Sequence, residues 1–443
     1  MEEILELIAA KKYSQLKEML ATMEPADIAY MFDEMPEQSM PLLYRLLPKE
    51  LAAEVFVELD ADTQEMLIRS FSDSELKEML DELYLDDAVD IIEEMPANVV
   101  KRIIMHTEPE MRARINEILN YPKDSAGSVM TIELVDLKED MTVSDAFTRI
   151  RRTGLDKETI YTCYVTDKNR VLMGIVSAKD LLLADEECVI SDIMETNVIY
   201  MHTYDDKEEV ALELSKYDLL AIPIVDNEQR LVGIVTVDDA IDVLQEEATE
   251  DIEKMAAMTP SEKPYLKTGI IDTCLQRIPW LLLLMISSTF TGKIISHYES
   301  ALGELIILTT FIPMIMGTGG NSGSQSSVTV IRGLSLEEIE FRDIFKIIWK
   351  ELQVAIICGV VLAVATYFKV LWIDGASALI STVVALTLLF TIILAKLVGC
   401  VLPLLAKKVG FDPAVMASPF ITTIVDALSL VVYFDIASRI LGL

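Results

Sequence analysis

The sequence has few of the residues that build catalytic or redox centres. It contains three histidines and five cysteines in 443 residues, and the cysteines are scattered, without a Cys-x-x-Cys pair. A disulfide framework and a zinc site are therefore not predicted. The sequence also lacks a phosphate-binding glycine loop and any obvious pairing of a nucleophile with a base, so we expect no enzymatic activity.

Basic residues are scarce in the first part of the chain. Residues 1–269 contain 26 Lys and Arg against 60 Asp and Glu, a net charge of −34, whereas residues 270–443 contain 11 against 12. This excess of carboxylates argues against nucleic acid as a partner, because binding to phosphates needs clustered Lys and Arg. The carboxylates also repel one another unless cations bind, which favours a metal-cation sensor.

A secretory leader is not predicted either. The N-terminal residues MEEILELIAAKKYSQ form an acidic amphipathic stretch, without a basic region, an apolar run and a cleavage site in succession. We therefore expect no signal peptide, and we expect the acidic part of the chain to lie in the cytosol.

Residues 1–120 show a helical pattern that recurs every 24 residues. Phe32, Phe56 and Leu80 occupy equivalent positions, and each is followed by acidic residues. Prolines at positions 25, 36, 41, 48 and 96 punctuate the turns between helices. Short amphipathic helices in tandem predict a small acidic superhelix.

A second repeat follows, with a period of 59 residues. The segments YVTDKNRVLMGIVSAKDLL and PIVDNEQRLVGIVTVDDAI each combine a strand, a turn, a second strand and a helix. This pattern resembles a tandem pair of CBS domains. We expect the last aspartate of each copy to cap the following helix. The equivalent residues are Asp167 and Asp226, Gly174 and Gly233, and Asp180 and Asp239.

A further acidic helix is predicted from Leu244 to about Met258. Leu244, Ala248, Ile252 and Met255 share one stripe of this helix, and prolines at 260 and 264 end it just before the apolar part of the chain. It is the expected mechanical link between the two parts.

The rest of the chain divides into five apolar stretches, each long enough to cross about 30 Å of hydrocarbon. Lys and Arg gather after the second and fourth stretches, so the positive-inside rule places the acidic part in the cytosol and the C-terminus outside. The stretches cover roughly residues 276–298, 302–331, 347–373, 376–406 and 413–441, and the basic residues are Arg332, Arg342, Lys346, Lys350, Lys407 and Lys408.

Two features within the apolar part carry polar groups. The segment GTGGNSGSQS, from Gly317 to Ser326, either exposes carbonyls and amides to an ion path or allows close packing of helices through small residues. Asp426 is the one carboxylate well inside the last stretch. Its charge is costly there, so either a permeating cation offsets it or it pairs with Lys396 as a purely structural group.

Together these segments closely resemble the MgtE family of magnesium transporters and channels. The resemblance is carried by four segments, which follow one another along the chain as YPKDSAGSVMT, VDDAIDVLQEEATEDI, GTGGNSGSQS and DPAVMASPFITTIVDALSL. It implies an all-α superhelical N domain, an α/β tandem CBS pair, a connector helix and an all-α membrane domain with five transmembrane helices. The implied ranges are residues 1–120, 121–186 and 187–243 for the cytosolic domains, 244–272 for the connector and 273–443 for the pore domain.

The resemblance also implies a homodimer in the plasma membrane whose paired fifth helices bind hydrated Mg²⁺ at Asp426. Carboxylate and carbonyl acceptors suit Mg²⁺, which dehydrates reluctantly. Ser418 stands where members of the family can carry an asparagine, and Lys396 where a neutral polar residue is expected. The implied pore residues are Gly319, Gly320, Asn321, Ser418, Thr422 and Asp426.

Regulatory Mg²⁺ sites are implied on the cytosolic domains and the connector, and ATP is a further candidate ligand of the CBS pair. Mg²⁺ would draw acidic faces together and close the pore. The implied ligands are Glu54, Asp86, Asp90, Asp206, Glu208, Asp218, Asp239, Asp242, Glu247, Glu250 and Asp251.

Two other functions stay open. The chain could transport another divalent cation, such as Mn²⁺, Co²⁺ or Ca²⁺, since oxygen ligands do not separate these ions from Mg²⁺. Alternatively, it could be a membrane sensor that responds through its CBS pair and transports nothing. Asp426 and the Gly317–Ser326 segment favour transport.

Overall fold

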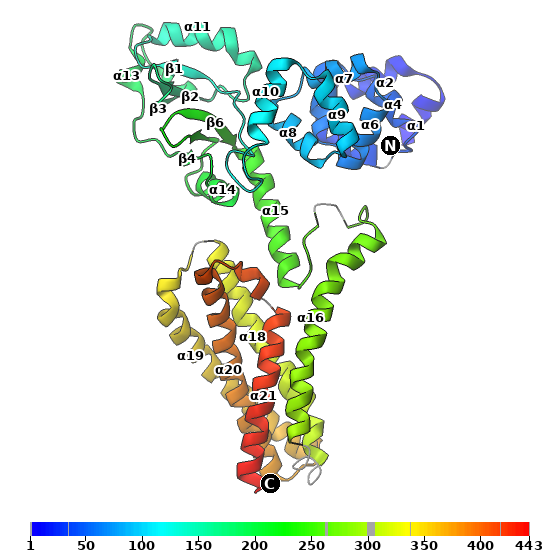
Figure 1. Ribbon diagram of the computed structural model, residues 1–443, viewed down its shortest axis with the longest axis vertical. Helices are drawn as coiled ribbons and strands as arrows, with labels where there is room; N and C mark the ends of the chain where they lie inside the picture. Colours follow the sequence, from blue (N-terminus) through cyan, green and yellow to red (C-terminus); the bar gives the residue numbers. More distant parts are fainter. Residues whose placement is uncertain are drawn as a thin grey trace. The chain divides into compact units, whose positions relative to one another are not determined.

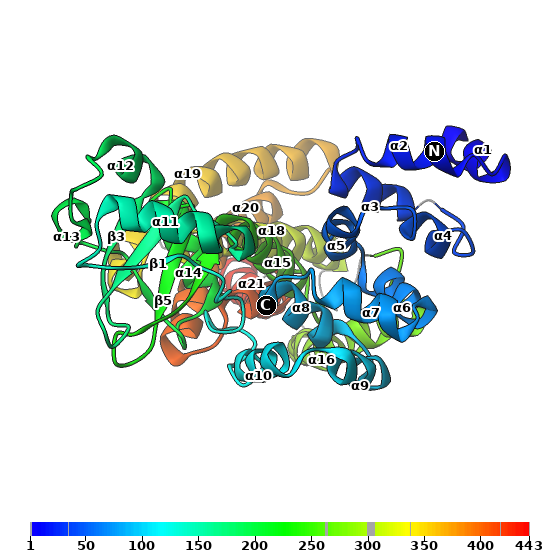
Figure 2. The ribbon, with the colours of Figure 1, turned by 90° about the horizontal axis from the view of Figure 1, so that it is seen from above.

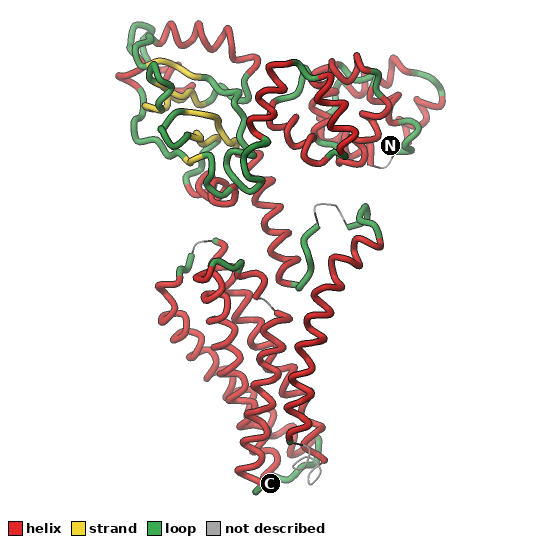
Figure 3. The backbone as a smooth tube through the Cα atoms, in the orientation of Figure 1, coloured by secondary structure: helices red, strands yellow, loops and turns green. Residues whose placement is uncertain are grey.

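The computed structural model describes residues 2–33, 35–261, 265–298, 306–336, 338–416 and 418–442. The chain forms two compact units, Met1–Leu244 and Gln245–Leu443. Among the described residues, all named strands lie in the first unit, and the second is built of helices (Figure 3).

The first unit begins with a series of short helices that follows the 24-residue period. Helices α3, α5, α7 and α9 begin 24 residues apart and contact one another in turn (Figure 2). The predicted series of tandem helices is confirmed. The helices are α1 (Glu2–Ala9), α2 (Tyr13–Leu20), α3 (Pro25–Asp33), α4 (Met40–Tyr44), α5 (Lys49–Val57), α6 (Ala61–Ser70), α7 (Asp73–Leu80), α8 (Leu85–Glu94), α9 (Ala97–His106) and α10 (Pro109–Ile118).

Repeated residues explain this period. Phe32, Phe56 and Leu80 lie near the ends of α3, α5 and α7, and all three are buried in one continuous apolar core. Pro48 and Pro96 immediately precede α5 and α9, where proline fixes the backbone without removing a helical hydrogen bond.

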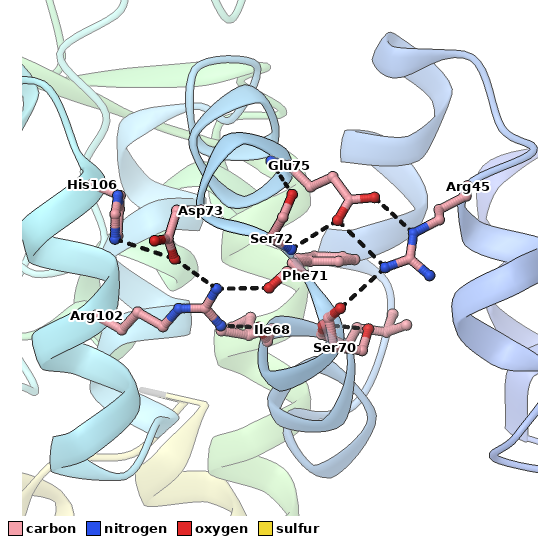
Figure 4. Close-up of polar contacts among 10 residues, drawn as sticks. Arg45, Ile68, Ser70, Phe71, Ser72, Asp73, Glu75, Arg102 and His106 are labelled. Carbon is pink, nitrogen blue, oxygen red and sulfur yellow. Dashed lines mark hydrogen bonds and ion pairs between the residues drawn. The ribbon is translucent and has the colours of Figure 1, made fainter.

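Two arginines from other helices hold the C-terminal end of α6 (Figure 4). Arg102 donates to the carbonyl oxygens of Ile68 and Phe71, both at 2.6 Å, and Arg45 donates to that of Ser70 at 3.0 Å. The last carbonyls of a helix have no partner within it and carry partial negative charge, so cations stabilise this end.

The 59-residue repeat folds into two three-stranded sheets with the same topology. In each, a parallel strand pair is followed by an antiparallel hairpin, and the register irregularity falls at equivalent positions. The strands are β1 (Asp136–Lys138), β2 (Thr162–Thr166), β3 (Leu172–Ser177), β4 (Met201–His202), β5 (Ala221–Val225) and β6 (Leu231–Thr236). The helical elements are α11 (Val143–Thr153), η1 (Gly154–Asp156), α12 (Ala178–Leu183), α13 (Ile190–Ile193), α14 (Lys207–Lys216) and α15 (Val237–Met255).

The repeated glycines lie where a chain segment crosses the hairpin. A Cβ atom at Gly174 would come within 2.8 Å of the Glu195 carbonyl oxygen, and one at Gly233 within 2.6 Å of the Thr131 carbonyl oxygen. Backbone hydrogen bonds tie Ile175 to Glu195 and Ile234 to Thr131 at these crossings. The absence of a side chain therefore lets each copy add a segment beside its hairpin.

The predicted helix cap in the first copy is wrong by three residues. Ser177, not Asp180, is the N-cap of α12, and Asp180 accepts from the Ser177 backbone as the third residue of a capping box. In the second copy, the Thr236 hydroxyl likewise donates to Asp239 at 2.6 Å. The acidic helix is longer than expected, because α15 runs without a break from Val237 to Met255.

The second unit contains α16 (Ile270–His297), η2 (Ile306–Phe311), α18 (Ile312–Ser335), η3 (Phe341–Asp343), α19 (Ile344–Phe368), a π-helical turn η4 (Lys369–Ile373), α20 (Ala378–Val409), η5 (Pro413–Met416) and α21 (Ser418–Leu441) (Figure 1). Among the described residues, four segments are long and apolar enough to cross a membrane: Ile270–His297, Phe341–Ile373, Ala378–Val409 and Pro413–Leu441. They correspond to four of the five predicted stretches. The α18 helix is not among them, because Gly317–Ser326 makes it more polar, so five spans stay a prediction.

Helix α20 packs against α18, α19 and α21. The α18 helix approaches its neighbours through glycines: Gly319 and Gly323 lie against Val425 of α21, and a Cβ atom at Gly399 of α20 would overlap the Gly323 carbonyl oxygen. The close-packing interpretation of the Gly317–Ser326 segment is therefore correct for these glycines.

Replacing Arg102 with methionine should weaken the first unit. Methionine keeps the aliphatic part of the arginine side chain but leaves the carbonyl groups of Ile68 and Phe71 without their donor. We expect this change to lower the free energy of unfolding by about 2 kcal/mol. Hydrogen exchange of the α6 and α7 amides, followed by mass spectrometry, measures this loss. The control is Arg69→Met, which removes an exposed ion pair with Glu65 on α6 and should cost about 0.5 kcal/mol or less. Equal exchange in the two variants would contradict this account of Arg102.

Candidate functional site

Carboxylates from four parts of the first unit influence one another electrostatically. They come from α8, from the segment before β1, from the loop after η1 and from the start of α15. We call them the acidic cluster: Asp86, Asp87, Asp90, Glu133, Glu158, Asp238 and Asp239.

Their surroundings oppose ionisation. Burial, followed by the charge of Asp239, raises the pKa of Asp87 and of Glu158 to about 7. Burial also raises the pKa of Asp239 to about 6, although its hydrogen bond with Thr236 acts in the opposite direction. Asp90 lies one turn after Asp86 on α8 and is exposed to solvent, and the charge of Asp239 acts on it as well. At neutral pH these groups therefore keep part of their protons, and a cation that binds beside them would compete with those protons.

Asp86 shows the imbalance most clearly. The residue is 7% exposed, its Oδ1 atom is buried without a hydrogen-bond partner, and burial and the Asp239 charge raise its pKa well above the usual range. Within the described part of the chain, no Lys, Arg or His forms an ion pair with Asp86, Asp87, Asp90, Glu158 or Asp239. No side chain of the described residues therefore neutralises these five carboxylates as a fixed counter-ion.

The described residues do not form a site that would bind a metal ion directly. Among the described residues, no three carboxylate, histidine or cysteine groups gather closely enough to hold one metal ion directly. Mg²⁺ keeps several of its waters in protein sites and binds one or two carboxylates at a time.

The cluster includes only part of the predicted regulatory set. Asp86, Asp90 and Asp239 belong to it, and their neighbours Asp87 and Asp238 could have been found from the sequence as aspartate doublets. Glu133 and Glu158 carry no such signal, because they lie in irregular segments far from α8 in the sequence.

Other predicted regulatory residues have local structural roles. Asp206 is the N-cap of α14 and accepts from the Glu208 backbone at 2.8 Å. Asp218 is exposed just after α14 with a φ of 52°, a left-handed conformation that aspartate tolerates better than most residues. Glu54 is an exposed residue of α5. Metal binding by these four residues stays a prediction.

The end of α15 is tied to the membrane unit by polar contacts. Lys254 pairs with Glu250 and with Asp412, each at 2.7 Å, so Glu250 already has a cationic partner. Asp251 accepts from the Ser335 hydroxyl of α18 at 2.9 Å. Asp242 and Glu247 lie on the same helix, and metal binding by the four predicted carboxylates of this stretch stays a prediction.

The predicted pore residues lie along α18 and α21. Asp426 is half-buried on α21 and has no hydrogen-bond or ion-pair partner among the described residues. Thr422, one turn earlier, lies against Gly320 of α18. Gly319 and Gly320 are buried, whereas Asn321 is exposed on α18. Ser418 begins α21, and its side chain lies outside the described residues.

The predicted alternative of an ion pair between Lys396 and Asp426 is wrong, because Lys396 pairs with Glu351 instead. The ammonium group of Lys396 lies 3.7 Å from the Glu351 carboxylate and donates to the Ser326 hydroxyl at 3.3 Å. Sequence reasoning missed Glu351. This residue lies near the start of α19, beside basic residues that we assigned to a cytosolic loop.

Protein-family models match four ranges of the chain. The model for MgtE, described as a divalent cation transporter, matches residues 312–436, and the model for the MgtE intracellular N domain matches residues 23–124. CBS domain models match residues 126–187 and 190–246.

Similar proteins extend over nearly the whole chain. Magnesium transporter MgtE of Thermus thermophilus is 37% identical over 430 residues, which are 96% of this chain and 95% of the relative. Magnesium transporter MgtE of Bacillus subtilis is 34% identical over 440 residues, 98% of this chain and 96% of the relative.

Two solved structures resemble the first part of the chain. One is the cytosolic domain of the Mg²⁺ channel MgtE in complex with ATP, with 37% identity, a TM-score of 0.52, and coverage of 54% of this chain and 98% of that one. The other is the soluble part of a magnesium transporter, with 30% identity, a TM-score of 0.53, and coverage of 56% and 97%.

The acidic cluster predicts that stability depends on pH and on Mg²⁺ together. Because folding raises the pKa of Asp87, Glu158 and Asp239, the folded state binds more protons than the unfolded state. Without divalent ions, the stability of the first unit should therefore fall as pH rises through about 6 to 7. Hydrogen exchange of α8 and of the first turns of α15, corrected for intrinsic rates, measures the change.

Saturating Mg²⁺ should largely remove this fall, because the ion replaces the protons as the positive charge. Asp239→Asn should flatten the pH dependence, whereas Asp140→Asn, a change of an exposed residue outside the cluster, should not. Stability that rises with pH in Mg²⁺-free solution would contradict the electrostatic description of the cluster.

Proposed function

The chain belongs to the MgtE family of divalent cation transporters, and from this premise we propose how its carboxylates move and sense Mg²⁺. It is a multi-pass membrane protein that transports Mg²⁺. We assign permeation to Asp426 and feedback control to the acidic cluster. The observation that carries this assignment is that, among the residues the structure describes, no Lys, Arg or His forms an ion pair with Asp426 or Asp86.

Asp426 is the permeation site in this proposal. A carboxylate within a membrane-spanning helix needs a partner, and Lys396, the lysine in the middle of α20, is engaged by Glu351. A passing Mg²⁺ supplies the charge, and the Thr422 hydroxyl and backbone carbonyls of α21 offer oxygen acceptors to its water shell.

A second copy of the chain completes the path. The described residues of α16 include none that is buried, and α18 exposes the amides of Asn321 and Gln325. Exposed amides are unfavourable in hydrocarbon, so a partner subunit or a water-filled path should cover them. A homodimer would bring two copies of Asp426 to one pore, which suits a divalent ion.

Feedback control would run through α15. This helix begins at the acidic cluster, where burial and the charges of Asp238 and Asp239 raise the pKa of Asp87 on α8. It ends at the membrane unit, where Asp251 and Lys254 contact Ser335 and Asp412. When cytosolic Mg²⁺ is high, bound ions would draw α8 and α15 together and hold the pore closed. When Mg²⁺ is low, repulsion would separate them.

The orientation follows from charge. Lys and Arg cluster beside the loop between α18 and α19 and at the end of α20, so these ends should face the cytosol. The acidic cluster then also lies in the cytosol, and the C-terminus lies outside the plasma membrane. ATP is a proposed ligand of the CBS pair, since a relative's cytosolic domain was crystallised with it.

The permeation assignment predicts that Asp426→Asn abolishes Mg²⁺ uptake into liposomes without dispersing the assembled protein. The amide preserves the shape of the side chain but removes the charge that attracts the ion. Asp435→Asn is the control, because Asp435 lies on the same helix as an exposed partner of Arg439. Uptake by Asp426→Asn at the wild-type rate would remove Asp426 from the path.

The feedback assignment predicts a different effect for Asp90→Asn with Asp239→Asn. Fewer carboxylates bind Mg²⁺ more weakly, so half-inhibition should need about tenfold more cytosolic Mg²⁺. Current through the full chain, recorded as cytosolic Mg²⁺ is raised, gives this value. An unchanged inhibition curve, or an equal shift in Asp140→Asn, would reject the cluster as the sensor.

A further inference from the structure

Lys396 is a buried cation in the middle of the membrane unit. Its side chain is 6% exposed and that of Glu351 is 13% exposed. The Ser326 hydroxyl accepts from Lys396 and donates to the same Glu351 oxygen that pairs with Lys396. Three helices, α18, α19 and α20, therefore meet at one ion pair bridged by a hydroxyl.

The helix segments that carry Lys396 and Asp426 pack against the same part of α18. Gly323 of α18 is one turn before Ser326, and a Cβ atom there would lie 3.1 Å from the Ala395 carbonyl oxygen and 3.3 Å from the Val425 side chain. Ala395 immediately precedes Lys396, and Val425 immediately precedes Asp426. The residues that immediately precede the cation and the permeation carboxylate in the chain thus pack against the same glycine from α20 and α21.

An uncompensated Lys396 would oppose cation transport at this position. A fixed positive charge in a medium of low dielectric repels a divalent ion and attracts any nearby carboxylate. Asp426 has no partner among the described residues, so it would be the available anion. Stability alone does not explain the buried pair, since such pairs are often no more stabilising than apolar residues of similar size.

We propose that Glu351 is a positioning residue for Mg²⁺ transport: it neutralises Lys396 and holds it on the α18–α19 side, which leaves Asp426 to the permeating ion. This inference rests on the proposed role of Asp426. Ser326 fixes the geometry, because its single hydroxyl contacts both charged groups.

The test compares Glu351→Gln, Lys396→Gln and the double variant by Mg²⁺ uptake into liposomes as a function of Mg²⁺ concentration. Glu351→Gln should raise the half-saturating Mg²⁺ concentration about tenfold, because it frees the cation. Lys396→Gln should keep wild-type uptake, and the double variant should regain it. Glu351→Asp, which keeps the charge, should resemble the wild type.

A matched control is Asp374→Asn, which breaks the Lys369–Asp374 ion pair in the same unit and should leave the half-saturating concentration unchanged. A merely structural ion pair predicts something else: equal losses in Glu351→Gln and Lys396→Gln, without rescue in the double variant. That result, or an unaffected Glu351→Gln, would overturn the proposal. If Glu351→Gln does not assemble, Lys396→Gln decides, since loss of uptake by the assembled variant also overturns it.

The Asp426→Asn variant separates the two assignments. If it takes up Mg²⁺ as the wild type does, the permeation site is wrong and the role of Glu351 falls with it. If it is inactive while Glu351→Gln and Lys396→Gln behave alike, only the counter-ion role is wrong.

Discussion

A carboxylate that is taken out of water needs a positive charge nearby, and most of this structure depends on how that need is met. Glu351 and Glu250 have lysine partners within the chain. Asp86 and Asp426 have none among the described residues. The groups without fixed partners are those we assign to Mg²⁺, because a protein that must release its cation cannot bind it with a permanent counter-charge.

The same division explains why α15 can act as a link. We assign Mg²⁺ sensing to carboxylates in its first turns, whereas its last turns carry Lys254 and Asp251 in contacts that do not need a metal. Met255 adds apolar contact with Ile331 of α18 and Ala414 of η5. One end of a continuous helix is therefore responsive, and the other is anchored to the helix that carries Gly319 and Gly323.

Periodic patterns in the sequence predicted the elements well, because each repeat fixes a local unit: the 24-residue period became evenly spaced helices, and the 59-residue period became two equivalent sheets. Contacts between distant segments were harder. Asp239 was identified from the family resemblance, but Glu158 was missed because only folding brings its loop to α15. The Lys396 partner was missed for the same reason, since Glu351 lies on a different helix and beside residues that suggested a loop.

The central claim is that Asp426 conducts Mg²⁺ within the membrane and that the acidic cluster senses the Mg²⁺ concentration in the cytosol. The most direct measurement is Mg²⁺ flux through the purified chain in liposomes, with Mg²⁺ as the only permeant cation and its concentration varied on the side of the acidic cluster. The account predicts a flux that declines steeply as Mg²⁺ on that side rises. No flux at any concentration, or a flux indifferent to Mg²⁺ on that side, would contradict it.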